Sequence, residues 1–403
     1  MAAARVLMMS QGASLAHVAR PAALSAALGH CELHFARTAR TARFVGLPTA
    51  TQHELAETMT PERFVARMAA GQPLFDEATL HADVAEDLRI IDAVKPDLII
   101  GDLRLSLQVS ARLAGVRFGL ISNAHWSPEL PLSTYPLPDH PAASVVGRSL
   151  AARVFRALTG PIFRQHAKPL NAVRARHGLR PLSEMREIYQ DADDVLFADD
   201  SHLYPTMERS RFLAPIIWEP STPAPAWFEQ LAPSDDLALL TVGSTGSNKL
   251  ISGGAIEAMT SLGLRVMVAT ADRGAAPEGV LTAPYIPGYR AAKKSRVVVC
   301  NGGSLSLAQA LAAGRPFLGL CSNMDQFLAC QPLVEAGAGL MLPASQANSR
   351  RVRAALQQLI ENPRFSAVAR SLQPRFAPAL APARFRAWLD GVFGLRAATP
   401  VAA

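Results

Sequence analysis

The sequence predicts an α/β fold with two halves, each built around a parallel β-sheet. Short apolar runs of about four to six residues alternate with helical stretches along the chain, and this alternation is typical of βαβ units. The alternation breaks once, in a proline-rich segment near the middle, and then restarts. The chain has 403 residues, of which 49% are hydrophobic and 18% charged, so it is long enough and apolar enough for two domains.

In the N-terminal half, predicted strands alternate with predicted helices. The elements expected here cover residues 5–9 (strand), 18–28 (helix), 32–36 (strand), 97–102 (strand), 103–114 (helix) and 118–122 (strand). Ligands of parallel sheets bind at the carboxyl ends of the strands. At these ends the sequence places the segment from Ser10 to His17, the carboxylate of Asp102, and the segment from Asn123 to Trp126.

The middle of the chain predicts a domain boundary. Three prolines between Pro220 and Pro225 cannot continue a helix or a sheet, so residues 218–235 are expected to form a semi-rigid linker. After it, the expected elements are strands over residues 237–242, 265–270, 296–300 and 317–320, a helix over 305–313, and paired terminal helices within 348–372. We therefore expect one domain over residues 1–217 and another over residues 236–403, with a cleft between them and the last helix free to pack back on the first domain.

The net charge of +7 does not by itself indicate a nucleic-acid partner. The chain has only five lysines, its arginines are dispersed along the sequence, and aromatic residues make up only 6% of it, too few for a base-stacking platform. Arginine-rich, lysine-poor composition is typical of GC-biased codon usage. The basic excess still suits an anionic ligand or an anionic membrane surface.

The cysteines, histidines and apolar segments exclude further classes. The four cysteines include no CxxC pair, so neither a disulfide framework nor a zinc ribbon is encoded. All ten histidines lie at or before His202, which excludes a histidine-based metal site in the C-terminal half. No segment reaches about 18 uncharged apolar residues, so no transmembrane helix is expected, and the first apolar run is too short for a signal peptide. A reduced, cytoplasmic chain is the expectation.

Two strand-to-helix turns in the C-terminal half are candidates for binding phosphate. Residues 243–247 are small and follow a strand, although a plain turn is an equal interpretation of that segment. Residues 301–306 lead from a strand into a helix, whose free N–H groups and positive dipole end favour an anion. Two such turns in one domain suit a diphosphate.

Two residue pairs have both a chemical and a structural interpretation. Asp325 and Gln326 follow a predicted strand and could bind sugar hydroxyls, or Asp325 could be the N-cap of a helix. His17 follows the first strand, and with Asp102 behind it could take a proton from a hydroxyl near neutral pH. A structural or surface histidine is the alternative.

The donor side of the chain resembles a known family. Residues 297–316, the pair Asp325–Gln326 and residues 335–339 together resemble the nucleotide-sugar signature of family 1 (UDP-glycosyltransferase-like and macrolide-glycosyltransferase-like) enzymes with the GT-B fold. The start of the chain is similar to that family's acceptor-domain opening at Gly12, His17, Pro21, Gly29 and His30. The resemblance implies two Rossmann-like domains whose parallel sheets face each other across a cleft, the first binding the acceptor and the second the nucleotide-sugar donor.

The resemblance implies a reaction and its catalytic pair. His17 would be the general base of an inverting displacement at the anomeric carbon, and Asp102 would orient it. The enzyme would be a hexosyltransferase that moves a hexose or deoxyhexose from a UDP- or dTDP-sugar to a hydroxyl of a small apolar or lipid acceptor, with no metal or other cofactor. Residues 49–75 and 125–140 are expected to be acceptor loops, with His125 and Trp126 on the acceptor side.

The resemblance also implies the donor-binding residues, which are Ser244, Ile286, Asn301, Gly302, Gly303, Ser304, Ser306, Gln309, Asp325 and Gln326. Ile286 would hold the base through its backbone and Gln309 would contact the ribose. The serines and glycines would contact the diphosphate, and Asp325 with Gln326 the hydroxyls of the sugar.

The chain departs from the family pattern on the donor side. Asn301 stands where the family has histidine, Leu305–Ser306 where it has glycine–threonine, and Gln309 where it has glutamate. A charge-assisted hydrogen bond is about twice as strong as a neutral one, so Asn301 would weaken donor binding by about 1–2 kcal/mol unless an arginine compensates. The departures leave an alternative open, a catalytically degenerate homologue that acts as an auxiliary or binding partner. We expect a monomer or homodimer, with peripheral contact at the inner membrane face as an option.

Overall fold

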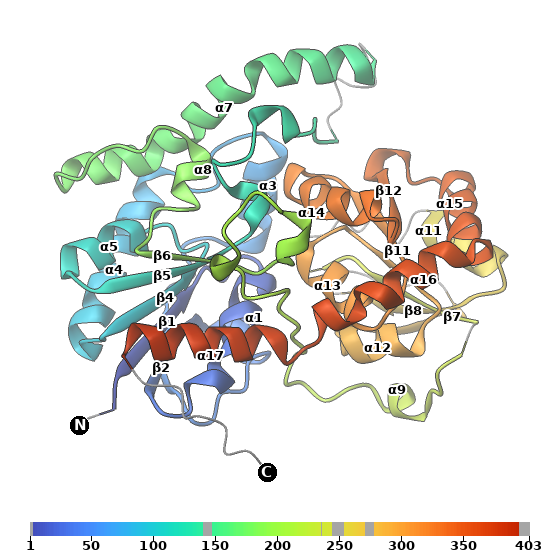
Figure 1. Ribbon diagram of the computed structural model, residues 1–403, viewed down its shortest axis with the longest axis horizontal. Coiled ribbons are helices and arrows are strands. Elements are labelled where there is room, and N and C mark those ends of the chain that lie inside the picture. The colour runs from blue at the N-terminus through green and yellow to red at the C-terminus, as the bar shows by residue number, and fades with distance from the viewer. Residues whose placement is uncertain (1–2, 140–146, 235, 244–253, 271–277, 395–403) are drawn as a thin grey trace.

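The computed structural model contains two α/β lobes that lie side by side (Figure 1). It describes residues 3–139, 147–234, 236–243, 254–270 and 278–394. Each lobe has one six-stranded sheet in which every described strand pairing is parallel. The two-sheet α/β architecture expected from the sequence is confirmed.

The N-terminal sheet has the strand order β3-β2-β1-β4-β5-β6. Its strands are β1 (Arg5–Ser10), β2 (Glu32–Thr38), β3 (Thr51–Leu55), β4 (Leu98–Asp102), β5 (Arg117–Ser122) and β6 (Asp194–Phe197). The helices of this half are α1 (Leu15–Leu24), α2 (Ala39–Ala42), α3 (Pro61–Ala69), α4 (Glu77–Val94), α5 (Leu107–Ala114), α7 (Arg148–Arg176) and α8 (Met185–Ile188). The register pairs Ser10 with Asp102, so both carboxyl ends meet at one edge.

The C-terminal sheet has the order β12-β11-β10-β7-β8-β9. Its strands are β7 (Leu237–Thr241), β8 (Arg265–Ala269), β9 (Leu281–Ala283), β10 (Val297–Cys300), β11 (Phe317–Cys321) and β12 (Gly339–Pro343). The helices that follow the proline-rich segment are α9 (Ala226–Gln230), α11 (Gly254–Ser261), α12 (Gly288–Lys294), α13 (Ser304–Ala312), α14 (Met324–Glu335), α15 (Ser349–Glu361), α16 (Pro363–Leu372) and α17 (Leu380–Val392).

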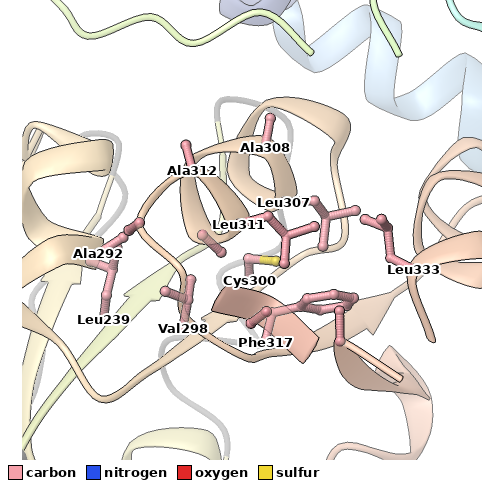
Figure 2. Packing of buried hydrophobic residues seen from close by; sticks show 14 of the residues in the cluster. Leu239, Ala292, Val298, Cys300, Leu307, Ala308, Leu311, Ala312, Phe317 and Leu333 are labelled. Carbon is pink, nitrogen blue, oxygen red and sulfur yellow. The ribbon is translucent and has the colours of Figure 1, made fainter. Parts of the chain in front are cut away.

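Alternate residues along each inner strand face opposite helical layers, because a strand has a period of two. Met8 of β1 packs in one apolar cluster with residues of α1 and α17, and its neighbour Leu7 packs in another with residues of α4 and α5. In the C-terminal lobe, Val298 and Phe317 pack under α13, as Figure 2 shows. Helix α17 therefore covers the N-terminal sheet although it ends the described chain, and its contacts with α1 bring the chain back across the lobes.

The eight inner strands match the apolar runs of the sequence, whereas the four edge strands β3, β6, β9 and β12 were not predicted. An edge strand is covered less completely, so its sequence need not be apolar: in β3 only Leu55 is buried. The expectation that residues 49–75 form a loop is wrong, because this segment contains β3 and α3. The expected start of a helix at residue 103 is also wrong, since α5 begins at Leu107.

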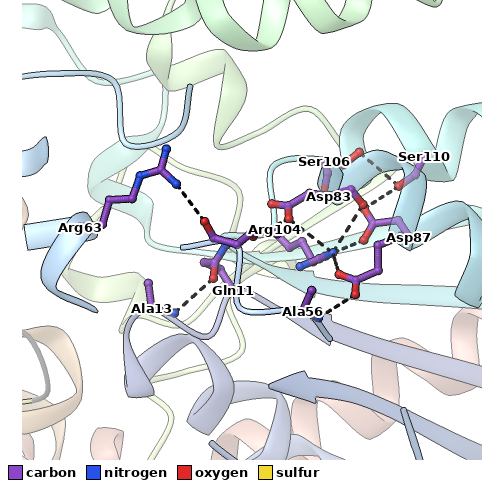
Figure 3. Close-up of polar contacts among 11 residues, drawn as sticks. Gln11, Ala13, Ala56, Arg63, Asp83, Asp87, Arg104, Ser106 and Ser110 are labelled. Carbon is purple, nitrogen blue, oxygen red and sulfur yellow. Dashed lines mark hydrogen bonds and ion pairs between the residues drawn. The ribbon is translucent and has the colours of Figure 1, made fainter. Parts of the chain in front are cut away.

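A buried ion cluster fixes the turn between β4 and α5 (Figure 3). Arg104 is 3% exposed, and its Nε donates to Asp87 Oδ1 at 2.6 Å while its Nη2 donates to Glu86 Oε2 at 2.9 Å. Burial raises the pKa of Asp87, although Arg104 opposes the shift. The preceding residue, Leu103, has a φ of 51°, which is unfavourable for a side chain of this kind. The cluster on α4 thus holds the strained turn that directly follows Asp102.

Helix α7 is 29 residues long and runs across the top of the N-terminal lobe in the view of Figure 1. It carries seven lysine and arginine residues in its sequence. Throughout the described part of the chain, no helix combines the length and the apolar character needed to cross a bilayer.

Three cysteines pack around one glycine turn of the C-terminal sheet. Gly302 follows β10 with a φ of 80°, and a Cβ at this position would lie 2.6 Å from Cys321 Sγ and 2.9 Å from Cys330 Sγ. Cys300, which ends β10, is buried beside them, and burial raises the pKa of its thiol to about 12. The cysteines therefore pack as small apolar groups that leave room only for glycine.

We predict that Gly302→Ala lowers the free energy of unfolding by about 2–4 kcal/mol, because it adds both a positive-φ penalty and a steric overlap. Gly263→Ala is the matched control, since Gly263 has a φ of 75° but no atom within 4 Å of a built Cβ. The control should lose about 1–2 kcal/mol. Equal losses in urea denaturation would show that the cysteine packing does not restrict this turn.

Candidate active site

A cavity of about 1260 Å³ lies between the two lobes. It is lined by the carboxyl ends of β4 and β5, by α1, α3 and α7, and on the other side by the turns ahead of α12, α13 and α14. The cavity brings together most of the predicted site residues, which are His17, Asp102, Trp126, Ile286, Asn301, Gly303, Ser304, Ser306, Gln309, Asp325 and Gln326. Ser244 lies outside the described residues.

His17 and Asp102 form a hydrogen-bonded pair at the floor of this cavity. His17 lies in the first turn of α1, and Asp102 ends β4. The distance from His17 Nδ1 to Asp102 Oδ1 is 2.7 Å. Asp102 is 1% exposed, whereas the His17 side chain keeps 22% of its surface open. The same Nδ1 lies 3.0 Å from Arg20 Nη2. In the tautomer in which Nδ1 donates to the carboxylate, the lone pair of the neutral imidazole is on Nε2.

Arg20, one turn after His17 on α1, binds the same carboxylate through two hydrogen bonds. Its Nε donates to Asp102 Oδ2 at 2.7 Å and its Nη2 donates to Asp102 Oδ1 at 2.7 Å. Burial would lower the pKa of Arg20, but the charge of Asp102 outweighs it and raises that pKa. Arg20 was not predicted from the sequence. Its signal was the three-residue spacing from His17, which places both side chains on one face of a helix.

The polar chain continues along the carboxyl ends of the neighbouring strands. Arg20 Nη1 donates to Asn123 Oδ1 at 2.7 Å, and Asn123 Nδ2 donates to both carboxylate oxygens of Asp199 at 3.1 Å. The backbone N–H of Ala124 also donates to Asp199, at 2.7 Å. Burial raises the pKa of Asp199 against the effect of these contacts. Through Ala124 the network fixes the short 3₁₀ turn η2 (Ala124–Trp126).

His125 and Trp126, the two residues expected on the acceptor side, bond across to the C-terminal lobe. Asp325 Oδ1 accepts hydrogen bonds from His125 Nε2 at 3.0 Å and from Trp126 Nε1 at 2.8 Å. Burial would raise the pKa of Asp325, but these bonds and the field of His125 hold it well below its ordinary range. No described hydrogen bond involves Asp325 Oδ2. Oδ1 of Asp325, a residue that lines the cavity, therefore ties the lobes together.

His125 itself is 2% exposed and does not line the cavity. Trp126 does, and it packs with Tyr189 at a centroid distance of 5.3 Å and with Phe163 at 6.5 Å. Tyr189 was not expected from the sequence, because it lies between predicted elements and carries no motif. Further apolar side chains on this side of the cavity are Phe64, Val65, Met68, Leu105, Leu158, Ile162, Met185 and Ile188.

The turn ahead of α13 presents donors to the cavity from the opposite lobe. Asn301 is 5% exposed, and its Oδ1 accepts from the N–H of Gly303 at 3.2 Å, which leaves Nδ2 as its donor. Gly303 is the N-cap residue of α13, and Ser304 and Ser306 lie in its first turn. Gly302 packs against the cysteines and is not a lining residue. Among the described lining residues, Arg20 is the only arginine or lysine, and it is bound to Asp102. No described arginine therefore compensates for Asn301.

The remaining donor-side residues are partly engaged. Gln309 Nε2 donates to the Trp218 carbonyl at 2.7 Å, which ties α13 to the proline-rich segment. Gln326 Oε1 accepts from the N–H of Ser322 at 2.7 Å, and Asn323 caps α14, so the alternative of Asp325 as the N-cap is wrong. Ile286 is 6% exposed and lies in the loop before α12. Across the described ranges, no group of three or more histidine, cysteine, aspartate or glutamate residues is arranged to hold a metal ion.

Comparisons with known proteins agree with this architecture. Residues 262–385 match the family described as erythromycin biosynthesis protein CIII-like, C-terminal domain. The chain is 37% identical over 383 residues to the PGL/p-HBAD biosynthesis glycosyltransferase of Mycobacterium tuberculosis, which covers 93% of this chain and 89% of the relative. It is also 37% identical over 381 residues to the PGL/p-HBAD biosynthesis rhamnosyltransferase of Mycobacterium bovis, covering 92% and 84%.

A solved structure shares the fold at lower identity. The Streptomyces sp. SF2575 glycosyltransferase SsfS6, complexed with thymidine diphosphate, superposes with a TM-score of 0.67 at 19% sequence identity. The superposition covers 96% of this chain and 99% of that chain. At this level of identity the likeness concerns the fold.

We predict that Arg20→Met lowers the free energy of unfolding by about 3–5 kcal/mol at neutral pH, because it leaves the buried Asp102 charge without its main partner. Arg63→Met is the control: Arg63 pairs with Asp76 at 2.5 Å, but its side chain is 43% exposed, so the loss should be about 0–1 kcal/mol.

Urea denaturation of wild type, Arg20→Met and Arg63→Met measures these losses. Equal losses in the two variants would contradict a buried ion pair between Arg20 and Asp102 as the source of the stability.

Proposed function

The chain belongs to the macrolide-glycosyltransferase-like branch of the family 1 glycosyltransferases and has their GT-B fold, and from this premise we propose that it transfers a sugar with inversion at the anomeric carbon. The donor would be a UDP- or dTDP-sugar that carries a hexose or deoxyhexose. The acceptor would be a hydroxyl of an apolar or lipid molecule. Glycosyl transfer from a nucleotide sugar is the activity of the family. In our proposal residues 1–217 bind the acceptor, residues 236–403 bind the donor, and residues 218–235 link them.

The observation that carries the proposal is the position of the His17–Asp102 pair. The pair and the N-terminus of α13 line the same cavity from opposite lobes. An acceptor hydroxyl beside His17 Nε2 would give up its proton to the imidazole as its oxygen attacks the anomeric carbon, and the nucleoside diphosphate would leave toward α13. Asp102 would stabilise the imidazolium that forms, and the hydrogen bonds from Arg20 hold that carboxylate in place.

The donor diphosphate would be bound mainly by backbone and neutral side-chain donors. The free N–H groups at the start of α13, the hydroxyls of Ser304 and Ser306, and Asn301 Nδ2 are available for it. We propose that these groups meet the leaving-group charge without a metal ion. Asp325 Oδ2 and the Gln326 side-chain amide would accept and donate hydrogen bonds to hydroxyls of the sugar.

The acceptor side supports an apolar substrate. Trp126, Phe163 and Tyr189 form an aromatic wall near the catalytic pair, and apolar side chains of α3 and α7 extend the cavity outward. The names of the two mycobacterial relatives support PGL/p-HBAD-type acceptors, and the second supports a deoxyhexose, rhamnose, as the transferred sugar. The alternative of a degenerate auxiliary protein is not favoured, since the chain aligns over 93% of its length with a relative named as a glycosyltransferase.

We predict that His17→Ala reduces transfer by about 10²–10⁴-fold, because the acceptor hydroxyl loses its base. Binding of dTDP or UDP, followed by thermal shift, should not change. His202→Ala is the control, since His202 bonds to Asp200 outside the cavity. Assays with UDP- and dTDP-sugars in parallel also identify the donor. Unchanged turnover in His17→Ala would remove this residue as the base.

We predict that Asp325→Asn reduces transfer by about 10–100-fold, since a neutral amide replaces a charged acceptor of sugar hydroxyls. The affinity for free dTDP or UDP should stay within about threefold. Asp139→Asn is the matched control, because Asp139 also bonds across the lobes. The backbone N–H of Ser345 donates to Asp139 Oδ2 at 2.6 Å. If Asp139→Asn loses as much activity as Asp325→Asn, closure of the lobes rather than sugar contact explains the effect.

A further inference from the structure

The apolar surface of the molecule is concentrated on one helix. Five large hydrophobic side chains are classed as exposed among the described residues, and four of them lie on α7 or beside it. Leu150 is 53% exposed, Val154 50% and Leu158 48%. Leu132 lies in the 3₁₀ turn η3 (Leu132–Thr134), which contacts α7 and approaches it at Gly160. The three α7 residues repeat every four positions, so they form a continuous stripe.

The same helix carries the excess positive charge of the chain. Its 29 residues include seven arginines and lysines and no aspartate or glutamate, and the net charge of the whole chain is also +7. Arg174 and Arg176 pair with Asp191 and Glu77. Arg174 is buried. The exposed cations of the helix that make no ion pair with any described residue are Arg153, Arg156, Arg164 and Lys168.

The helical positions order these groups around the α7 axis. At about 100° per residue, Arg153 and Arg164 fall within about 60° of Leu150 on one side of the Leu150–Val154–Leu158 stripe, and Arg156 falls about 120° from Leu150 in the same direction. The buried residues Ala151 and Thr159 fall on the other side of the stripe, toward the protein. The apolar stripe therefore lies between a basic row and the cleft. This is the arrangement of a helix that lies in a lipid–water interface, with apolar side chains inserted and cations near the headgroups.

The stripe is continuous with the acceptor side of the cavity. Leu150, Val154 and Leu158 are among the cavity-lining residues, as are Phe64 and Met68 on the facing helix α3. A chain that enters along α7 would therefore meet apolar side chains from the surface to the aromatic wall near His17. The exposed cations of α7 and the apolar stripe beside them favour an anionic lipid layer over a soluble protein as the partner that covers this face.

We propose that the exposed face of α7 docks the enzyme on an anionic lipid surface, with the mouth of the acceptor cavity turned toward the lipid. A lipid acceptor could then enter the cavity directly from the lipid layer, and this part of the inference rests on the proposed function. Docking itself requires neither donor nor catalysis. It can therefore be measured when no substrate is known.

The test is flotation of the full chain with phosphatidylcholine vesicles that contain or lack phosphatidylglycerol. We expect binding to the anionic vesicles, weakening as salt is raised. The triple variant Arg153→Gln, Arg156→Gln, Arg164→Gln removes the basic row without touching a cavity-lining residue. At roughly fivefold in affinity for each cation, its binding should fall about a hundredfold.

A second triple variant, Arg350→Gln, Arg353→Gln, Arg364→Gln, removes three exposed arginines from α15 and α16 and should bind within about twofold of wild type. The α7 variant should keep its thermal stability and its transfer to a water-soluble acceptor. Equal binding to neutral and anionic vesicles, or an α7 variant that binds like wild type, would overturn the proposal. Dimers by light scattering that the α7 variant abolishes would also overturn it in favour of a second copy on this face. If no sugar is transferred by any variant, the vesicle result still stands by itself.

Discussion

The burial of one carboxylate at the end of β4 organises the catalytic side of the molecule. Asp102 is 1% exposed, and an ionised carboxylate at such a position costs several kcal/mol unless it is paired and hydrogen-bonded. Arg20 supplies the paired charge but is itself buried, so its Nη1 also requires an acceptor, which is Asn123 Oδ1. The amide nitrogen of Asn123 in turn donates to the carboxylate of Asp199. His17 takes its orientation from the same carboxylate. The geometry of the proposed base thus follows from the requirement that a buried charge be satisfied.

The same polar chain determines how the lobes meet. Asp199 holds the N–H of Ala124, and the turn that follows carries the side chains of His125 and Trp126 to Asp325 on α14. Asp325 is at once one of the contacts between the lobes and the proposed contact to the sugar. Helix α17, which comes last in the described chain, packs on the N-terminal sheet and ties the lobes a second time. The proposed donor and acceptor positions are therefore connected by contacts that lead from Asp325 to the proposed catalytic pair.

The structure shows where the basic residues of the chain are concentrated. The arginines are spread along the sequence, and their number is in keeping with codon bias, yet one helix holds seven cations and no anion, and four of its exposed cations make no ion pair with a described residue. An even distribution would give only a weak field at any one surface. Concentrated beside an apolar stripe and the mouth of the cavity, the charge favours one orientation on a negative layer.

The sequence by itself determined the fold class, because strands buried on both faces must be nearly continuous apolar runs, and eight of the twelve strands are of this kind. It also placed His17, Asp102 and the turn from Asn301 to Ser306 at strand ends, where the sheet rule puts ligands. The four edge strands were missed since partial exposure permits polar residues there. Only the tertiary structure decided that Arg20 grips Asp102, that Gly302 is required by cysteine packing, and that His125 and Trp126 bond to Asp325. Each of these depends on groups from segments far apart in the sequence, and local pattern carries no information about which buried polar groups become partners.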